Sequence, residues 1–178
     1  ITLPAGRMIH DVAGVSIRFP RWTGEPFADD LGRKSAAMID LDGEHLFAEL
    51  AVLRLFEKAG WSGRWVNTTS AGKEVWKYLT DWADVPRAEQ RNRPIEDAEP
   101  RQVLARIAGF NKPRRYKGCW DVFAWRGADF AFAQCKRRTS KSVDVVTKDE
   151  LEWLRSAVYV GNRQVSEDSF CFVVWDYA

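Results

Sequence analysis

Hydrophobic residues recur at intervals of three and four along residues 43–60, which is the spacing of one face of an α-helix. Asp42 is a suitable N-cap and Gly60 a suitable end, so we expect a helix between them. Glu49 falls on the edge of the apolar stripe, where an acid is either half-buried for a reason or extended to water. The stripe itself comprises Leu46, Phe47, Leu50, Leu53 and Phe56.

The middle of the chain alternates strand-like and helix-like segments. Residues 63–69 (GRWVNTT) predict a strand, and residues 73–83 (KEVWKYLTDWA) suggest a second helix. Residues 84–100 are polar and rich in proline, which predicts a surface loop or insertion. Pro100 can start a short helix over residues 101–110, because its missing N–H is not needed in the first helical turn.

Two apolar runs in the second half predict an antiparallel hairpin. They are CWDVFAW (119–125) and ADFAFAQCK (128–136), and they are joined by Arg126 and Gly127. Glycine tolerates the positive φ that a tight turn requires. Within these runs Asp121, Gln134 and Lys136 interrupt the apolar pattern.

The C-terminal part predicts one helix and one strand. Thr147 and Glu150 form a capping box that opens a helix. Residues 169–175 (SFCFVVW) are nearly all apolar, which is typical of a strand buried on both faces. Near the other end of the chain, residues 15–19 (VSIRF) predict a further strand.

These elements predict an α/β fold. A central mixed sheet would hold the hairpin at 121–136, and helices at 43–59 and 147–159 would flank it. We expect one α/β domain at 43–178 with a helical insertion at about 70–116, and an N-terminal extension at 1–42 packed on this core.

Composition agrees with an ordinary globular protein that binds no membrane. Of the 178 residues 46% are hydrophobic and 29% charged, and no apolar run approaches the roughly 18 residues that span a bilayer. No secretion signal is recognisable, so we expect an intracellular, cytoplasmic location. The nine Trp are expected mainly in packing. Three widely spaced cysteines, two of them in apolar runs, indicate free buried thiols. His10 and His45 lack the Cys or Ser partner that a hydrolase would need.

The charge is unevenly distributed. The net charge is only +2, but residues 101–141 hold eleven Lys or Arg against two Asp, which makes this segment +9 and the remainder −7. Such a block is either the footprint of a phosphate-backbone binder or a solvated face.

The interrupted hairpin has the chemistry of a hard-oxygen metal site. Gln134 and Lys136 share one face of their strand, and Asp121 lies on the neighbouring strand. The Asp121 carboxylate, the Gln134 amide oxygen and the main-chain carbonyl of Cys135 suit Mg²⁺ or Mn²⁺. Lys136 could orient a water, and Glu49 could add a second acidic oxygen. Equally, Asp121 could close a turn, residues 136–138 could be an exposed strand end, and Glu49 could pair with an arginine.

The order of these residues resembles the PD-(D/E)xK nuclease superfamily over residues 43–69 and 117–176. FAELAVLRLFEKAG is similar to its first helix, GCWDVFAW resembles its Gly-x-Pro-Asp strand, and FAQCKRR resembles its (D/E)xK strand. Trp120 replaces the proline, which is not a ligand. Gln134 replaces the usual acid and removes one charge from the metal site.

The resemblance implies a restriction-endonuclease-like fold and a metal-dependent DNA endonuclease that hydrolyses phosphodiesters. Asp121, Gln134, the Cys135 carbonyl and Glu49 would bind Mg²⁺ or Mn²⁺, and Lys136 would position the attacking water. A homodimer would suit cleavage of both strands, although no residue demonstrates it. We expect the DNA backbone to contact Arg114, Arg115, Arg137, Arg138 and Lys141.

Two alternatives remain open at the level of the sequence. In the first, Gln134 marks a lost metal site, and the same fold is an inactive nucleic-acid or protein binding module. In the second, the chain is an interaction protein without affinity for nucleic acid, and its basic block is a solvated face. Salt-sensitive retention on a heparin or DNA column would separate the second alternative from the others.

Overall fold

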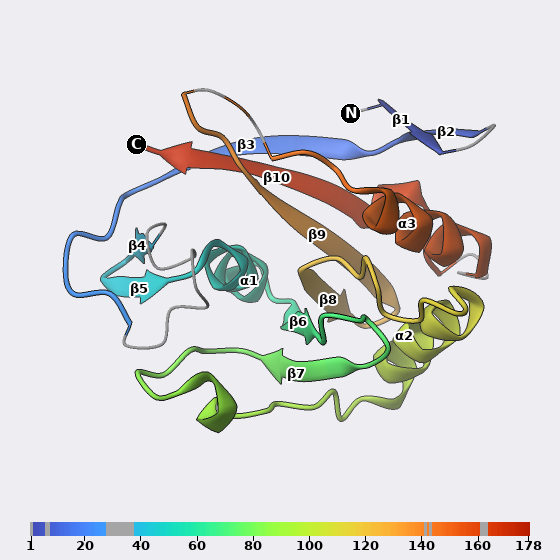
Figure 1. The fold of residues 1–178 in the computed structure, drawn as a ribbon, viewed down its shortest axis with the longest axis horizontal. Coiled ribbons are helices and arrows are strands. Elements are labelled where there is room, and N and C mark those ends of the chain that lie inside the picture. Colours follow the sequence, from blue (N-terminus) through green and yellow to red (C-terminus); the bar gives the residue numbers. More distant parts are fainter. Residues whose placement is uncertain (1, 6–7, 28–37, 141, 143, 161–163) are drawn as a thin grey trace.

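The computed structural model describes residues 2–5, 8–27, 38–140, 142, 144–160 and 164–178. It confirms an α/β fold whose centre is one mixed sheet of six strands in the order β3-β10-β9-β8-β6-β7 (Figure 1). β10 is parallel to both of its neighbours, and the remaining pairs are antiparallel. The strands are β3 (Ala13–Phe19), β6 (Ser62–Thr68), β7 (Val75–Leu79), β8 (Val122–Arg126), β9 (Asp129–Arg137) and β10 (Phe170–Tyr177).

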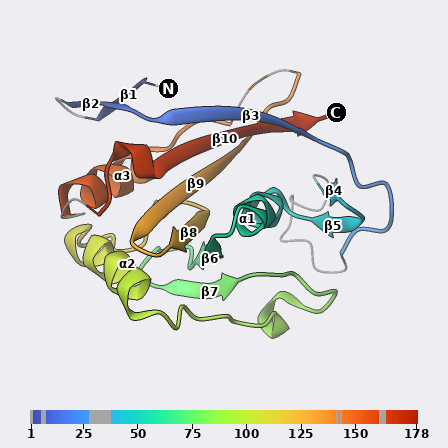
Figure 2. The same ribbon diagram turned by 180° about the vertical axis from the view of Figure 1, so that it is seen from behind.

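Helices cover the two faces of this sheet unequally. Helix α1 (Ala48–Lys58) lies on one face together with the hairpin of β4 (Ile39–Leu41) and β5 (Glu44–Leu46). Helices α2 (Ala98–Phe110) and α3 (Lys148–Val160) pack against each other on the opposite face, and the view from behind shows the same division (Figure 2). Side chains near α1 and side chains near α3 therefore lie on different sides of the sheet.

The alternation of β9 divides its side chains between two apolar cores. Phe130 and Phe132 belong to the core under α2 and α3, whereas Ala133 belongs to the core under α1 and Cys135 packs against it. Successive side chains of a strand point to opposite faces. Gln134 and Lys136 are therefore on the same face as Phe132, toward α3.

The predicted hairpin at 121–136 is confirmed with a small shift in its turn. Arg126 pairs with Asp129, so that the two turn residues are Gly127, with a φ of 57°, and Ala128. The predicted strands at 15–19, 63–69 and 169–175 correspond to β3, β6 and β10. β10 is central, between β3 and β9, because its run of apolar residues fits a position covered on both faces.

The first predicted helix is correct in its second half only. Residues 44–46 form β5, and the helix begins at Ala48 after Phe47 as N-cap. The prediction that Asp42 is an N-cap was wrong, because Asp42 and Gly43 have φ values of 56° and 86° and make the tight turn between β4 and β5. Gly60 does end the helix, with a φ of 80° and an N–H that donates to the Glu57 carbonyl.

The helix predicted at 73–83 is a strand. β7 pairs with β6 in a register that runs from Trp65 opposite Leu79 to Thr68 opposite Val75. Valine, tryptophan and tyrosine suit the half-buried surface of an edge strand, and this pairing overrides the helical spacing. The insertion at 70–116 therefore contributes a strand of the central sheet as well as helix α2, which begins at Ala98, two residues before Pro100.

The N-terminal segment contributes to the same sheet. β1 (Thr2–Ala5) and β2 (Met8–Asp11) pair as a hairpin beside α3, and β3 forms one edge of the six-stranded sheet. Within the described residues no helix is long and apolar enough to cross a membrane. The prediction that tryptophans serve mainly in packing is supported by the buried Trp65, Trp82, Trp120, Trp125, Trp153 and Trp175.

The structure confirms that the cysteines are free, and it gives His45 a packing role. All three cysteines are free, and each is half-buried rather than fully buried. His45 packs between the rings of Trp22 and Phe27, with centroids 4.7 and 4.4 Å away. The side chain of His10 lies outside the described residues.

Candidate functional site

Asp121 is fixed at the point where β8 begins. Its main-chain carbonyl accepts a hydrogen bond from Val66 N–H at 2.8 Å, which ties it to β6. Its carboxylate oxygen Oδ2 accepts from Cys135 N–H at 2.9 Å. The pairing of β8 with β9 stops at Val122 and Ala133, so the Asp121 carboxylate continues the ladder where the strands separate. An acid is thereby held at an opening in the sheet.

Gln134 lies opposite Asp121 and is bonded to it through one end of its amide. The Gln134 Nε2 donates to Asp121 Oδ2 at 2.7 Å. The other end, Oε1, is buried and has no hydrogen-bond partner in the described part of the chain. A buried amide oxygen without a partner is costly and requires an explanation, such as a ligand that it binds.

Lys136 is buried in an ion pair with Glu150. Its ammonium lies 2.8 Å from both Glu150 carboxylate oxygens and 3.0 Å from the main-chain carbonyl of Val145. The two side chains are only 7% and 12% exposed. Because a strand rises about 3.3 Å per residue, Lys136 and Gln134 are about 7 Å apart on one face. The pair therefore adjoins the Asp121–Gln134 contact.

Glu150 is the site residue that the sequence reasoning did not assign. Its capping-box role is confirmed, since its carboxylate accepts from Thr147 N–H at 2.8 Å and its N–H donates to Thr147 Oγ1 at 3.3 Å. The same carboxylate binds Lys136, and this contact depends on how α3 packs on the sheet. The capping box was a signal for the position of Glu150, but it gave no information about its distance from Lys136.

The segment before Asp121 holds the start of α3 against the sheet. Trp120 Nε1 donates to the main-chain carbonyl of Glu150 at 3.3 Å. Gly118 has a φ of 79°, and a Cβ at this position would collide with the main chain of Asp149. Only glycine permits this close approach without strain, and the approach brings Glu150 to the face that carries Gln134 and Lys136.

Glu49 is placed on the other side of the sheet. It lies in the first turn of α1, is 7% exposed, and belongs to the helix that covers the face opposite to α3. The carbonyl of Cys135 is better placed, because the N–H and C=O of a strand residue point to the same neighbour and this N–H meets Asp121. The structure thus brings together Asp121, Gln134, Cys135 and Lys136, with Glu150 in addition.

The basic residues predicted to contact DNA differ in their surroundings. Arg114 is paired with the carboxylate of Asp149, and Arg137 stacks over the rings of Trp175 and Tyr177. Arg115 and Arg138 are exposed. Lys141 lies outside the described residues. Arg138, directly after β9 and two residues from Lys136, is therefore exposed where a phosphate could reach it.

The pKa of the Cys119 thiol is affected by the Asp121 carboxylate nearby. Burial raises the pKa of Cys119 well above its ordinary value of 9.0, and the nearby Asp121 carboxylate raises it further. A thiolate beside a carboxylate is unfavourable because like charges repel. Cys119 is therefore a protonated thiol at neutral pH and not a candidate nucleophile.

The oxygen atoms at the site suit a hard divalent cation. They comprise the Asp121 and Glu150 carboxylates, the unpartnered Gln134 Oε1 and the Cys135 carbonyl. Magnesium and manganese bind carboxylate and carbonyl oxygens in preference to nitrogen or sulfur. Within the described ranges no three His, Cys, Asp or Glu side chains gather as a metal-binding group. The two carboxylates and the amide are therefore the donors that this site offers.

No protein family, curated protein or solved structure was found to match this chain.

Proposed function

We propose that the chain is a divalent-metal-dependent DNA endonuclease of the PD-(D/E)xK type. The observation that carries the proposal is the buried Oε1 of Gln134, which has no partner among the described residues. The Nε2 of the same amide donates to Asp121, and Gln134 lies two residues before Lys136, which pairs with Glu150. A neutral amide in place of an acid weakens a cation site, and Glu150 compensates by supplying a second carboxylate from α3. A divalent cation held by such oxygen ligands would polarise a phosphoryl oxygen and make a bound water more nucleophilic.

The residues divide into ligands and a positioning lysine. Asp121, Gln134, Glu150 and the Cys135 carbonyl would hold Mg²⁺ or Mn²⁺, which when bound acts as a Lewis acid toward the phosphate. Lys136 has three N–H donors to orient the attacking water and to offset negative charge on the phosphate in the transition state. Glu150 is the ion-pair partner of this ammonium, so substrate or metal would have to compete with the pair.

The proposed substrate approaches at the end of β9. Arg138 is exposed there, and Arg115 is exposed on the segment between α2 and β8. Arginines hold the phosphate backbone without reading the base sequence, so we expect binding that weakens steeply with salt. A contribution of Glu49 is not part of the proposed mechanism, because α1 lies across the sheet from Lys136.

The test is incubation of the protein with supercoiled plasmid and with single-stranded DNA in Mg²⁺, Mn²⁺ or EDTA. We expect nicking in Mn²⁺ and Mg²⁺, none in EDTA, and none with Lys136→Ala. Glu150→Gln is the sharper variant, because glutamine keeps an acceptor for Thr147 N–H but removes the charge. It should reduce the cleavage rate at least about ten-fold while the circular dichroism spectrum stays unchanged. Lys58→Ala, an exposed lysine on α1, is the control that should cut at the wild-type rate.

A binding module without catalysis is the second candidate. It is favoured by the satisfied state of Lys136, whose ammonium has three hydrogen-bond acceptors within the protein. This candidate predicts that DNA binds equally in EDTA and Mg²⁺ and that no metal yields nicked plasmid. Cleavage that persists at the wild-type rate in both Lys136→Ala and Glu150→Gln would overturn the proposed site.

A further inference from the structure

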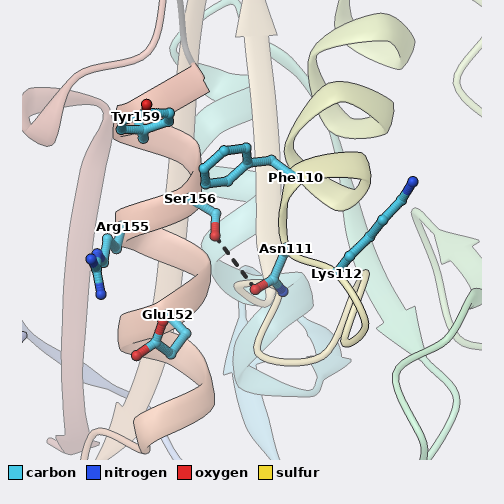
Figure 3. Close-up of a pocket in the computed structure, with 7 residues that line it drawn as sticks. All are labelled: Phe110, Asn111, Lys112, Glu152, Arg155, Ser156 and Tyr159. Atoms are coloured by element: carbon cyan, nitrogen blue, oxygen red, sulfur yellow. Dashed lines mark hydrogen bonds between the residues drawn. The ribbon is translucent and has the colours of Figure 1, made fainter.

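Two aromatic rings stack on each other at the surface between α2 and α3. Phe110 and Tyr159 have centroids 4.7 Å apart and an interplanar angle of 25°. They are 49% and 74% exposed, so the two rings together present apolar area to solvent. The rings form one wall of a pocket of about 280 Å³ (Figure 3).

The floor of this pocket is polar and rigid. Ser156 and Asn111 are each 6% exposed, and Ser156 Oγ lies 3.4 Å from Asn111 Oδ1. Both N–H groups of Asn111 Nδ2 are engaged, since this nitrogen donates to the carbonyls of Arg115 and Lys117 at 2.8 and 3.2 Å. The Ser156 hydroxyl donates to Asn111 Oδ1, and each of the two oxygens keeps a lone pair that can accept a further hydrogen bond at the pocket (Figure 3).

Three charged side chains surround the opening. Lys112, Arg155 and Glu152 line the pocket, and none of them has an ion-pair or hydrogen-bond partner among the residues that the structure describes. The cations Lys112 and Arg155 could bind phosphate groups at the rim of the pocket. The Glu152 carboxylate and the acceptors of the floor disfavour a phosphate inside, so the interior suits an uncharged flat group that carries N–H donors.

We propose that this pocket binds one unpaired base of a single-stranded nucleic acid. The base stacks on the Phe110–Tyr159 pair, its N–H groups face the acceptors of Ser156 and Asn111, and Lys112 and Arg155 contact the flanking phosphates. Aromatic rings stack with any base, and cations at the same site track the backbone. The volume is slightly below that of ordinary ligand pockets, roughly 300 to 1,000 Å³, which suits a single base.

The position of the pocket relates it to the proposed nuclease site, and in this respect the inference rests on the proposed function. Glu150 and Ser156 are six positions apart on α3, which corresponds to about 9 Å along the helix. Arg114 and Lys117 bind Asp149, the residue before Glu150. A single strand that runs along α3 can therefore place a base in the pocket and a phosphate near Lys136, which gives a substrate with an unpaired segment.

The experiment measures binding in EDTA, where no cleavage occurs. Fluorescence anisotropy compares a short oligothymidylate with an oligomer of the same length that has the same backbone but no bases. We expect the wild type to bind the base-bearing strand about ten-fold more tightly. Tyr159→Ala and Phe110→Ala should each lower this preference severalfold. Tyr159→Phe should keep it, because the ring remains. Both rings are exposed, so we expect these variants to fold, as checked by circular dichroism.

Further variants separate stacking from charge. Lys112→Ala and Arg155→Ala should lower the affinity for the base-bearing and the base-free strand to a similar degree. Val15 is an exposed apolar residue on β3, and Val15→Ala should change neither affinity. Equal binding of both strands by the wild type would overturn the base pocket, even if the protein cuts DNA. A base preference that depends on Tyr159, in a protein that never cuts, would leave the pocket standing and reject the nuclease.

Discussion

The ammonium of Lys136 lies 2.8 Å from both carboxylate oxygens of Glu150, and the side chains are 7% and 12% exposed. Lys136 interrupts an apolar strand, and Glu150 belongs to the capping box of α3. Their pairing joins the sheet to the helix beyond the end of the ladder between β8 and β9, which stops at Val122 and Ala133. The pair therefore has both a structural and a proposed chemical role, and the two can be tested separately.

Lys136→Met should lower the free energy of unfolding by about 3 to 5 kcal/mol, because it leaves the Glu150 carboxylate buried without its partner. Adding Glu150→Gln should recover part of this loss, since no unpaired charge then remains. Urea unfolding followed by circular dichroism measures both. Arg18→Met, which breaks the exposed pair with Asp176, is the control and should cost less than about 1 kcal/mol. Similar losses for Lys136→Met and Arg18→Met would contradict the prediction.

Gly118→Ala should destabilise the protein by more than Gly60→Ala. Both glycines have φ near 80°, so both alanines carry a backbone strain of about 1 to 2 kcal/mol. At Gly60 nothing lies near the added Cβ, whereas at Gly118 it would collide with the main chain of Asp149. The displaced start of α3 should also slow cleavage, because Glu150 moves with it. Equal midpoints in urea for the two variants would show that α3 does not approach Gly118 this closely.

Gln134→Glu should make stability depend on divalent metal. The new carboxylate faces Asp121, whose Oδ2 now lies 2.7 Å from the Gln134 amide nitrogen, and two adjacent carboxylates repel each other. We expect a lower melting temperature in EDTA and a larger rise on addition of Mn²⁺ than in the wild type, since a ligand stabilises the state that binds it. Differential scanning fluorimetry measures both. The double variant with Asp121→Asn should lose the response to Mn²⁺, and a response that survives would place the cation elsewhere.

The thiol of Cys119 predicts a loss of stability at alkaline pH. Its pKa is raised, first by burial and then by Asp121, so the folded protein holds the proton to a higher pH than the unfolded chain does. The resulting stabilisation is complete below the ordinary value of 9.0 and is lost as pH rises above it. Cys119→Ser, which does not titrate in this range, should show a smaller fall in the free energy of unfolding between about pH 8 and about pH 10. Identical falls would mean that other groups account for the effect.

Local patterns identified most elements that lie inside the sheet or on it. The continuous apolar run at 169–175 predicted a central strand, because such a run is soluble only when covered on both faces. The capping box at Thr147 and Glu150 predicted the start of α3, because it depends on four consecutive residues. The segment at 73–83 was misassigned, because only the pairing of β7 with β6 decides between a strand and a helix there.

The sequence by itself determined which residues of the hairpin are chemically unusual, because Asp121, Gln134 and Lys136 break an apolar alternation that is visible in the residues alone. The tertiary structure decided which acids accompany them. Helix α1 packs on one face of the sheet and α3 on the other, so Glu49 lies across the sheet from Lys136 and Glu150 lies next to it. The physical reason is that the face on which a helix packs follows from burial of its whole apolar surface, which no local spacing encodes.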